Sequence, residues 1–172
     1  MSRKLSDLRP LVRQLCEQHI EACENAGLPI LVYCTYRSPI EQAILFRQSH
    51  SKAKVEAKIA ELSPWPYLAK ILIDVGPQKT LKKPVTNAGP GQSMHQYGLA
   101  YDCVPMNEGK PLWDDLEAYN RIGFLGEKIG LNWAGRWRGA LREMAHFQFG
   151  SPLWMTMAEK LNNELATAQP VR

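Results

Sequence analysis

Several features that define common protein classes are missing from this sequence. Its four cysteines (Cys16, Cys23, Cys34 and Cys103) include no C-x-x-C pair, so a cysteine zinc site or a redox motif has little support. No stretch approaches the ~18 apolar residues of a membrane span, and no apolar run of signal-peptide length follows the N-terminus. We therefore expect buried free thiols and synthesis in the cytoplasm without an export signal.

The composition is that of a folded domain. The 172 residues, 45% of them hydrophobic and 22% charged, suffice for one domain with its own core. The net charge of +4 favours an anionic partner, such as nucleic acid, a membrane surface or a bacterial wall polymer, without choosing among them. Because no repeat, low-complexity block or linker interrupts the chain, we expect a single domain over residues 1–172.

Hydrophobic periodicity predicts helices and short strands in mixed order. Helices are expected from a cap at Asp7 to Gly27, from Pro39 toward Ile59 with a break near Ser49–Ser51, and over Tyr67–Val75, Trp113–Ile129 and 152–166. Strands are expected over Ile30–Tyr36, Leu99–Val104, Leu131–Trp133 and His146–Phe149, with a loop over Gly76–Gln92. Without regular βαβ alternation, this order predicts an α+β fold with a small, mostly antiparallel sheet and flanking helices.

His95 and Asp102 form the first group of candidate site residues. His95 lies in a glycine-rich approach to the strand 99–104, and Asp102 lies within that strand among apolar neighbours. An unpaired carboxylate is expensive to bury there, and a divalent metal held by histidine and carboxylate would offset that cost. The alternative is a carboxylate satisfied by backbone N–H groups or directly by His95.

Glu143 and His146 form the second group. Glu143 lies three residues before His146, close enough to sit beside a metal without binding it. A catalytic zinc keeps three protein ligands and an open water position, and it needs a carboxylate that takes the proton of the water. Two histidines and two acids meet that requirement, although an ordinary Glu–His pair on a turn is the alternative. No H-E-x-x-H motif is present, so the prediction rests on the combination.

Arg37 is a further candidate because it follows a predicted strand and precedes a helix start. A guanidinium there could hold a substrate carbonyl or carboxylate, or the oxyanion that forms during attack. The alternative is a surface arginine paired with Glu41.

The order of these motifs resembles the D-alanyl-D-alanine-type zinc peptidases, which share a fold with lysostaphin-type enzymes and the hedgehog signalling domain. The resemblance covers about residues 28–149, the motif-bearing part of the chain. It rests on Ser93-x-His95, Gly98-x-Ala100-x-Asp102, Glu143-x-x-His146, Tyr36-Arg37-Ser38 with Gln42, and the Trp-rich stretch 130–137. Residues 85–93, leading into the histidine, look like the L-alanyl-D-glutamate endopeptidase branch, which includes many phage endolysins.

This resemblance implies specific roles for the candidate residues. Zn²⁺ would be held by His95, Asp102 and His146, with Glu143 as the catalytic base and Arg37 polarising the substrate carbonyl. Ser93 and Gln42 would help to seat the substrate. Glutamate at position 143, where many endolysin members have aspartate, resembles the dipeptidase and carboxypeptidase branches.

The implied function is that of a peptidoglycan peptidase. We expect a monomeric endolysin that cuts the L-alanyl-D-glutamate bond of the peptide stem and reaches the wall in the periplasm after membrane permeabilisation. The alternatives are a D,D-carboxypeptidase or D-Ala-D-Ala dipeptidase, a non-catalytic zinc or wall-binding module, and a nucleic-acid binder, which rests on charge alone and is not expected. The apolar stripe of helix 152–166 is expected to pack on the core or to touch a membrane weakly.

Overall fold

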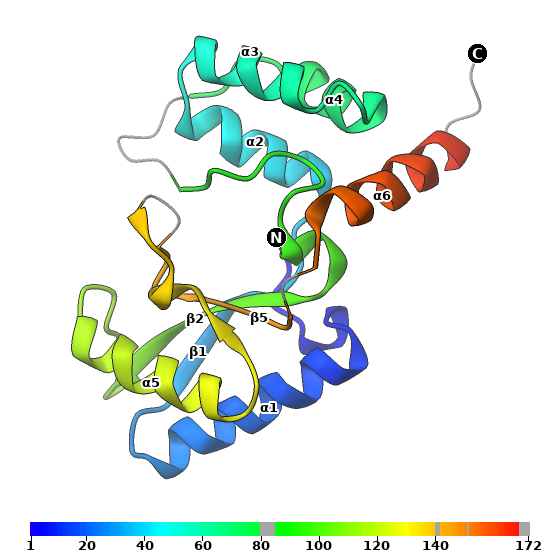
Figure 1. Cartoon of the computed structure of the whole chain (residues 1–172). Coiled ribbons are helices and arrows are strands. Elements are labelled where there is room, and N and C mark those ends of the chain that lie inside the picture. Colours follow the sequence, from blue (N-terminus) through cyan, green and yellow to red (C-terminus); the bar gives the residue numbers. More distant parts are fainter. Residues whose placement is uncertain (80–84, 140–141, 151, 169–172) are drawn as a thin grey trace. The chain divides into compact units, whose positions relative to one another are not determined.

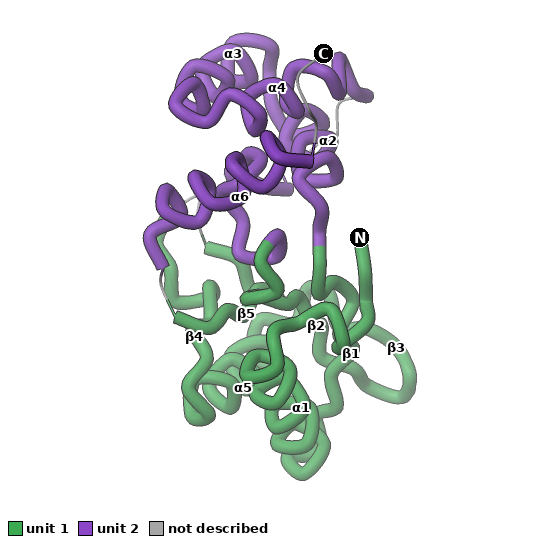
Figure 2. Tube along the Cα trace, turned by 90° about the vertical axis from the view of Figure 1, so that its right-hand side faces the viewer, with its two compact units in different colours: residues 1–36, 97–151 green, residues 37–96, 152–172 purple. Residues whose placement is uncertain are grey.

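The computed structural model describes residues 1–79, 85–139, 142–150 and 152–168 (Figure 1). The chain divides into two compact units, formed by residues 1–36 with 97–151 and by residues 37–96 with 152–172 (Figure 2). Each unit combines two segments that are far apart in the sequence, and each contains a cluster of buried apolar side chains.

Unit 1 contains the sheet and two long helices. Its helices are η1 (Leu5–Asp7), α1 (Pro10–Asn25), α5 (Leu116–Lys128) and η3 (Ala134–Arg136); its strands are β1 (Ile30–Cys34), β2 (Ala100–Asn107), β3 (Lys110–Pro111), β4 (Asn132–Trp133) and β5 (His146–Gln148). All strand pairs are antiparallel, in the order β1-β2-β5-β4, and β3 pairs with β2. The predicted α+β class with a small antiparallel sheet is confirmed.

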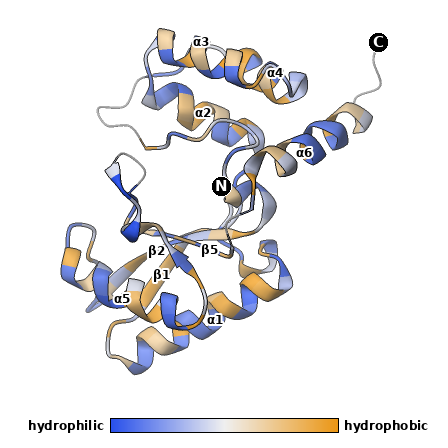
Figure 3. Cartoon of the chain, viewed as in Figure 1, coloured by the Kyte–Doolittle hydropathy of each residue, from blue (hydrophilic) through white to orange (hydrophobic). Residues whose placement is uncertain are grey.

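Strand alternation gives this sheet two different faces. Tyr101 pairs with Phe147, and Phe147 pairs with Trp133, so three aromatic side chains form a row across β2, β5 and β4. The row belongs to the core that the sheet shares with α1 and α5, two helices with both apolar and polar residues (Figure 3). Because successive side chains of a strand point to opposite faces, Asp102 and His146 point away from these helices.

His19 of α1 is a polar member of this core and is fully buried. Its Nε2 lies 2.8 Å from the carbonyl oxygen of Ile122, which can only accept, so Nε2 carries the hydrogen. Its Nδ1 then accepts from the Tyr101 hydroxyl at 2.7 Å. Burial lowers the pKa of His19 to about 4, because the charged ring would lose its hydration.

Unit 2 is helical. It contains α2 (Pro39–Ser49), α3 (Lys52–Glu61), α4 (Pro66–Asp74), α6 (Trp154–Ala168) and most of η2 (Met94–Tyr97), whose last residue belongs to unit 1. Helix α6 packs on α4: the Trp154 and Trp65 rings lie 5.0 Å apart, and the Asn162 side chain accepts a hydrogen bond from the Tyr67 backbone at 2.9 Å. None of the described helices has the length and apolar character needed to cross a membrane.

The start of α2 follows its sequence signals. The Ser38 hydroxyl accepts from the Glu41 backbone N–H at 3.2 Å, and the Glu41 carboxylate accepts from the Ser38 backbone N–H at 2.8 Å. This is a capping box with proline at the first helical position, and the helix begins at Pro39, as predicted. The predicted break also occurs, because α2 ends at Ser49 and α3 begins at Lys52.

One local prediction is wrong, and one short strand was missed. Asp7 does not cap the first helix: it ends η1, and α1 begins at Pro10 without a side-chain cap. Strand β3 was not predicted, because two residues are too short for a periodic signal; its hairpin turn places Glu108 and Gly109 at positive φ. Of the predicted loop over Gly76–Gln92, residues 80–84 lie outside the described part of the chain.

Gly98 anchors the segment that joins His95 to Asp102. Its φ is +65°, and a Cβ at this position would lie 2.8 Å from the Asp7 carbonyl oxygen. The Gly98 carbonyl accepts a hydrogen bond from the Arg9 backbone at 2.9 Å. The glycine of the motif is therefore required by both the left-handed backbone and the close approach of the chain before α1.

We predict that His19 makes the fold sensitive to acid. The unfolded chain protonates His19 near its ordinary pKa of 6.5, whereas the folded protein resists protonation down to about pH 4. The contribution of neutral His19 is therefore complete above pH 6.5 and is lost as the pH falls toward 4, by up to about 3 kcal/mol. Urea unfolding from pH 7 to 4, with a chelator present throughout, measures this loss.

His19→Gln supplies the matched control, because an amide can replace both hydrogen bonds without titrating. The variant should be less stable than the wild type at pH 7, and this difference should shrink as the pH falls to 4. If the free energy of unfolding falls with pH in parallel for the two proteins, the loss does not come from His19.

Candidate metal centre

Asp102 and His146 are paired across the middle of the sheet. They are direct partners in the β2–β5 register, and both are buried, with 2% and 6% of their surface exposed. His146 Nδ1 lies 3.0 Å from Asp102 Oδ1. Two residues 44 positions apart, both predicted as ligands, therefore have their polar atoms in contact.

Gln148 determines which nitrogen of His146 carries hydrogen. The Gln148 amide nitrogen donates to the Gly150 carbonyl at 2.9 Å, so its oxygen faces His146 Nε2 at 3.2 Å. An amide oxygen only accepts, and Nε2 is therefore the donor. In a neutral ring, Nδ1 then presents its lone pair toward the Asp102 carboxylate. Two acceptors 3.0 Å apart require either a proton or a metal ion shared between them.

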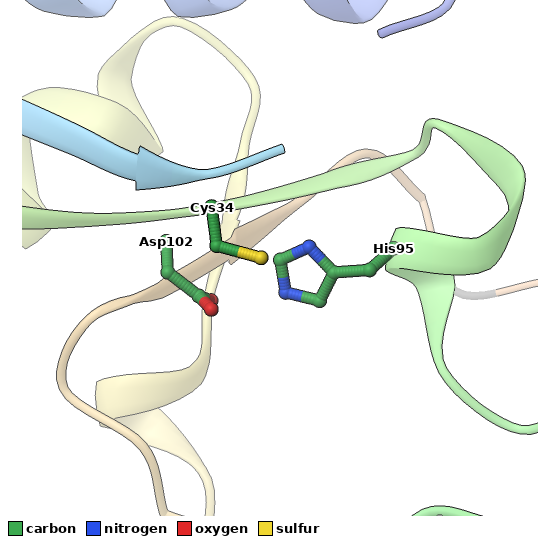
Figure 4. A group of neighbouring side chains, drawn as sticks. All are labelled: Cys34, His95 and Asp102. Carbon is green, nitrogen blue, oxygen red and sulfur yellow. The ribbon is translucent and has the colours of Figure 1, made fainter. Parts of the chain in front are cut away.

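Cys34 lies beside Asp102, on the strand opposite to that of His146. Cys34 and Asp102 are register partners in β1 and β2, and both are buried. Figure 4 shows the Cys34 and Asp102 side chains. Cys34 is a buried free thiol, as expected. His95 is buried in η2 of unit 2, and its predicted role as a metal ligand stays a prediction.

This donor set fits a zinc ion. Zinc is bound by imidazole nitrogen and carboxylate oxygen at about 2.0–2.2 Å in tetrahedral geometry, which separates two such ligand atoms by roughly 3.3 Å. The 3.0 Å between His146 and Asp102 is shorter than this by a few tenths of an ångström, so the two side chains would move slightly apart around a bound ion. In metal sites, the nitrogen of a ligating histidine that does not bind the metal usually donates to an acceptor, and Gln148 supplies such an acceptor to His146.

Glu143 is exposed and is held by its backbone in a turn before β5. Its N–H donates to the Ala134 carbonyl at 3.2 Å, and its carbonyl accepts from the His146 N–H at 3.4 Å. The Trp133 indole N–H donates to the Met144 carbonyl at 2.7 Å. The Trp-rich stretch that sequence analysis noted therefore fixes the turn that carries Glu143.

The Tyr33 hydroxyl feels the charges of both Asp102 and Glu143. Burial raises the pKa of the Tyr33 hydroxyl, and the negative charges of Asp102 and then Glu143 raise it further. Both carboxylates therefore act on the same hydroxyl, as expected if Glu143 lies near Asp102.

Arg37 precedes α2 and is oriented by Gln42. The guanidinium Nη1 donates to Gln42 Oε1 at 3.0 Å. The Gln42 amide donates in turn to Thr86 Oγ1 at 3.0 Å and to the Ala88 carbonyl at 2.6 Å. Gln42 is fully buried, so its observed role is to connect Arg37 to the segment around Thr86. Its predicted role in seating substrate stays a prediction.

Ser93 begins the turn that carries His95. Its carbonyl accepts from the Gln96 N–H at 3.1 Å, and its own N–H faces the Gln96 side-chain oxygen at 3.3 Å. The same oxygen accepts from the Gly91 N–H at 2.8 Å. Ser93 is 9% exposed, and its predicted contact with substrate stays a prediction.

Sequence reasoning missed residues whose importance depends on pairing. Gln148 and Cys34 have no motif of their own and become recognisable only from the strand register. His50, which lies among polar residues in the sequence, is partly buried against Phe46, with ring centroids 4.3 Å apart, and contacts the Thr86 carbonyl at 2.9 Å. Its polar neighbours in the sequence concealed this packing.

Comparison with known proteins agrees with the fold and the residue pattern. A protein 26% identical over 142 residues is peptidoglycan L-alanyl-D-glutamate endopeptidase CwlK of Bacillus subtilis (strain 168); the match covers 77% of this chain and 68% of CwlK. The structure of a VanY D,D-pentapeptidase mutant from the VanB-type vancomycin resistance cassette, in complex with Zn(II), has a TM-score of 0.50 and 17% identity, covering 91% of this chain and 78% of that one. The structure of the LdcB LD-carboxypeptidase has a TM-score of 0.51 and 17% identity; the match covers 95% of this chain and 68% of that one.

An antiparallel sheet that pairs a buried aspartate with a buried histidine, three residues after an exposed glutamate, defines a metallopeptidase-like site. The family model of VanY, D-alanyl-D-alanine carboxypeptidase, matches residues 5–134, and the chain belongs to this family. The resemblance stated from the motifs is thereby confirmed. The match contains His95 and Asp102 and ends before Glu143 and His146, and the structure pairs His146 with Asp102.

We predict that Gln148→Leu weakens zinc binding by roughly 10–100-fold, because Nε2 of His146 loses the acceptor that fixes its tautomer. Gln148→Glu keeps an acceptor at this position and should retain most of the affinity. Competition titration against a chromophoric chelator measures both variants. Equal losses of zinc affinity in the two variants, or no loss in Gln148→Leu, would show that Gln148 does not orient His146.

Proposed function

We propose that this protein is a zinc-dependent peptidoglycan peptidase. The observation that carries the proposal is the buried Asp102–His146 contact, in which two acceptor atoms 3.0 Å apart face each other. Membership of the VanY family and the similarity to CwlK support the choice of a peptidase and of peptidoglycan as its substrate.

Glu143 is the proposed catalytic base. A zinc ion held by His95, Asp102 and His146 would supply Lewis acidity and lower the pKa of a water molecule. The Glu143 carboxylate, exposed on its turn, accepts the proton of the attacking water and returns it to the leaving amine. A carboxylate outside the buried ligand set suits this role, because it stays accessible to water and substrate.

Arg37 is proposed to stabilise the negative charge that develops on the scissile carbonyl oxygen. Its guanidinium is held in one orientation by Gln42, which reduces the reorganisation needed during the reaction. We propose that Ser93, with Gln42, helps to seat the peptide.

The proposed bond is that between L-alanine and D-glutamate in the peptide stem. The segment 85–93 before His95 and the 26% identity to CwlK favour it. Glutamate at position 143 favours instead a D,D-carboxypeptidase or dipeptidase, which is the second candidate function. The endopeptidase and the carboxypeptidase or dipeptidase would release different products from peptidoglycan.

We further propose that the enzyme works as a monomeric lysin of phage type, reaching the wall after the membrane is permeabilised and binding no nucleic acid. The membrane contact considered for α6 competes with packing inside unit 2. Trp154, Ala158 and Asn162 of this helix make contacts within that unit. Leu153, just before α6, and Met155 are the most exposed large apolar residues of this segment, and we propose them for the weak contact with lipid.

Glu143→Gln should lower kcat for peptidoglycan hydrolysis by roughly 10²–10⁴-fold, because the amide cannot accept the proton of the attacking water. Zinc content should not change, since Glu143 is not among the proposed ligands. Release of soluble stem peptides measures the rate, and metal analysis measures the zinc. Glu117→Gln, at an exposed glutamate of α5, is the control and should keep full activity.

Mass spectrometry of the released fragments identifies the bond. We predict new N-terminal D-glutamate, formed only while zinc is present and abolished by a chelator. Free D-alanine would instead establish the carboxypeptidase activity. Zinc binding without any cleavage would contradict an enzymatic role.

A further inference from the structure

Tyr33 lies at an irregular point of β1, next to Asp102 in the strand register. Strand β1 pairs Val32 with Cys103, and the next pair is Cys34 with Asp102, so Tyr33 is an extra residue in the ladder. A β-bulge of this kind re-aims a side chain, and such bulges are frequent next to active sites. The Tyr33 side chain therefore starts from the backbone beside the buried carboxylate, on the outer strand of the order β1-β2-β5-β4.

Trp113 supports the Tyr33 ring. The two rings meet edge to face, with centroids 5.3 Å apart and planes at 66°. The segment that carries Trp113 is attached at both ends: the Leu112 N–H donates to the Pro105 carbonyl at 2.8 Å, and Asp115 caps α5 two residues after Trp113. The tryptophan is therefore fixed between β2 and α5, and it restricts the orientation of the Tyr33 ring.

The Tyr33 hydroxyl makes no hydrogen bond to any residue in the described part of the chain. A tyrosine hydroxyl that is largely removed from water usually has a hydrogen-bond partner. The Tyr33 side chain is partly buried, and its oxygen is not sealed from solvent. A ligand that arrives from solvent can therefore reach this hydroxyl.

Two acids of the proposed site act on the same hydroxyl. Burial raises the pKa of Tyr33, and the charges of Asp102 and then Glu143 raise it further. Because the interaction between charges weakens with distance, this hydroxyl lies near both carboxylates. It stays protonated at neutral pH and can donate a hydrogen bond. Tyr33, Trp113, Asp102 and Glu143 all belong to unit 1.

We propose that the Tyr33 hydroxyl donates a hydrogen bond to a carbonyl or carboxylate oxygen of the peptide substrate beside the scissile bond. This role rests on the proposed peptidase function and adds a substrate-binding residue to it. The ionised Asp102 and Glu143 carboxylates can only accept hydrogen bonds, whereas a substrate oxygen needs a donor. The tyrosine supplies this donor without adding a ligand to the metal, so the water position of the ion stays open.

Tyr33→Phe tests the hydroxyl alone, because it keeps the ring that packs on Trp113. We expect kcat/KM to fall about tenfold, the loss of one hydrogen bond to the substrate, with zinc content and Tm unchanged. The substrate is a soluble muropeptide with the complete pentapeptide stem, which contains the bonds of both candidate functions. Tyr67→Phe is the matched control: Tyr67 is a partly buried tyrosine of α4, and this variant should keep the wild-type kcat/KM.

The outcomes separate the role of Tyr33 from the proposed function. A wild-type kcat/KM in Tyr33→Phe would overturn the role of the hydroxyl and leave the peptidase function intact. A fall in kcat/KM that comes with lost zinc or a lower Tm would also overturn it, because the hydroxyl would then support the metal or the fold. If the zinc-loaded wild-type protein releases no product from this muropeptide, the peptidase function fails and the role of Tyr33 fails with it.

Discussion

The burial of the Asp102 carboxylate at the centre of the sheet is the constraint on which the rest of the site depends. Removing a carboxylate from water costs several kcal/mol unless a positive charge and hydrogen bonds compensate it. Asp102 is 2% exposed, and its register partners are a thiol on one side and an imidazole on the other. A cation between these groups, either a proton or a metal ion, would supply the compensating charge.

The surrounding structure holds the donors in place. The aromatic row of Tyr101, Phe147 and Trp133 packs the opposite face, so the two central strands cannot slip by one residue without burying Asp102 and His146 among apolar side chains. Trp133 also hydrogen-bonds the turn before His146, which links the apolar core to the position of the proposed base. The same side chains thus stabilise the fold and orient the chemistry.

Most of the architecture was predictable, because it depends on local signals. The start of α2 at Pro39 and the apolar periodicity of the helices were predicted correctly, whereas the cap at Asp7 was wrong because a short 3-10 turn displaces the start of α1. The metal-site candidates came from residue types and motif order. The role of Gln148 could not be predicted, since it depends on a strand register that no local pattern encodes.

A crystal structure grown with zinc, with anomalous diffraction recorded at the zinc edge, is the most direct test of the central claim. The account predicts one anomalous peak within bonding distance of His95, Asp102 and His146, at about 2.0–2.2 Å from each ligand atom. A zinc-saturated crystal with no peak there, and with His146 bonded directly to Asp102 as an imidazolium, would contradict it. The buried pair would then be a salt bridge that stabilises the sheet.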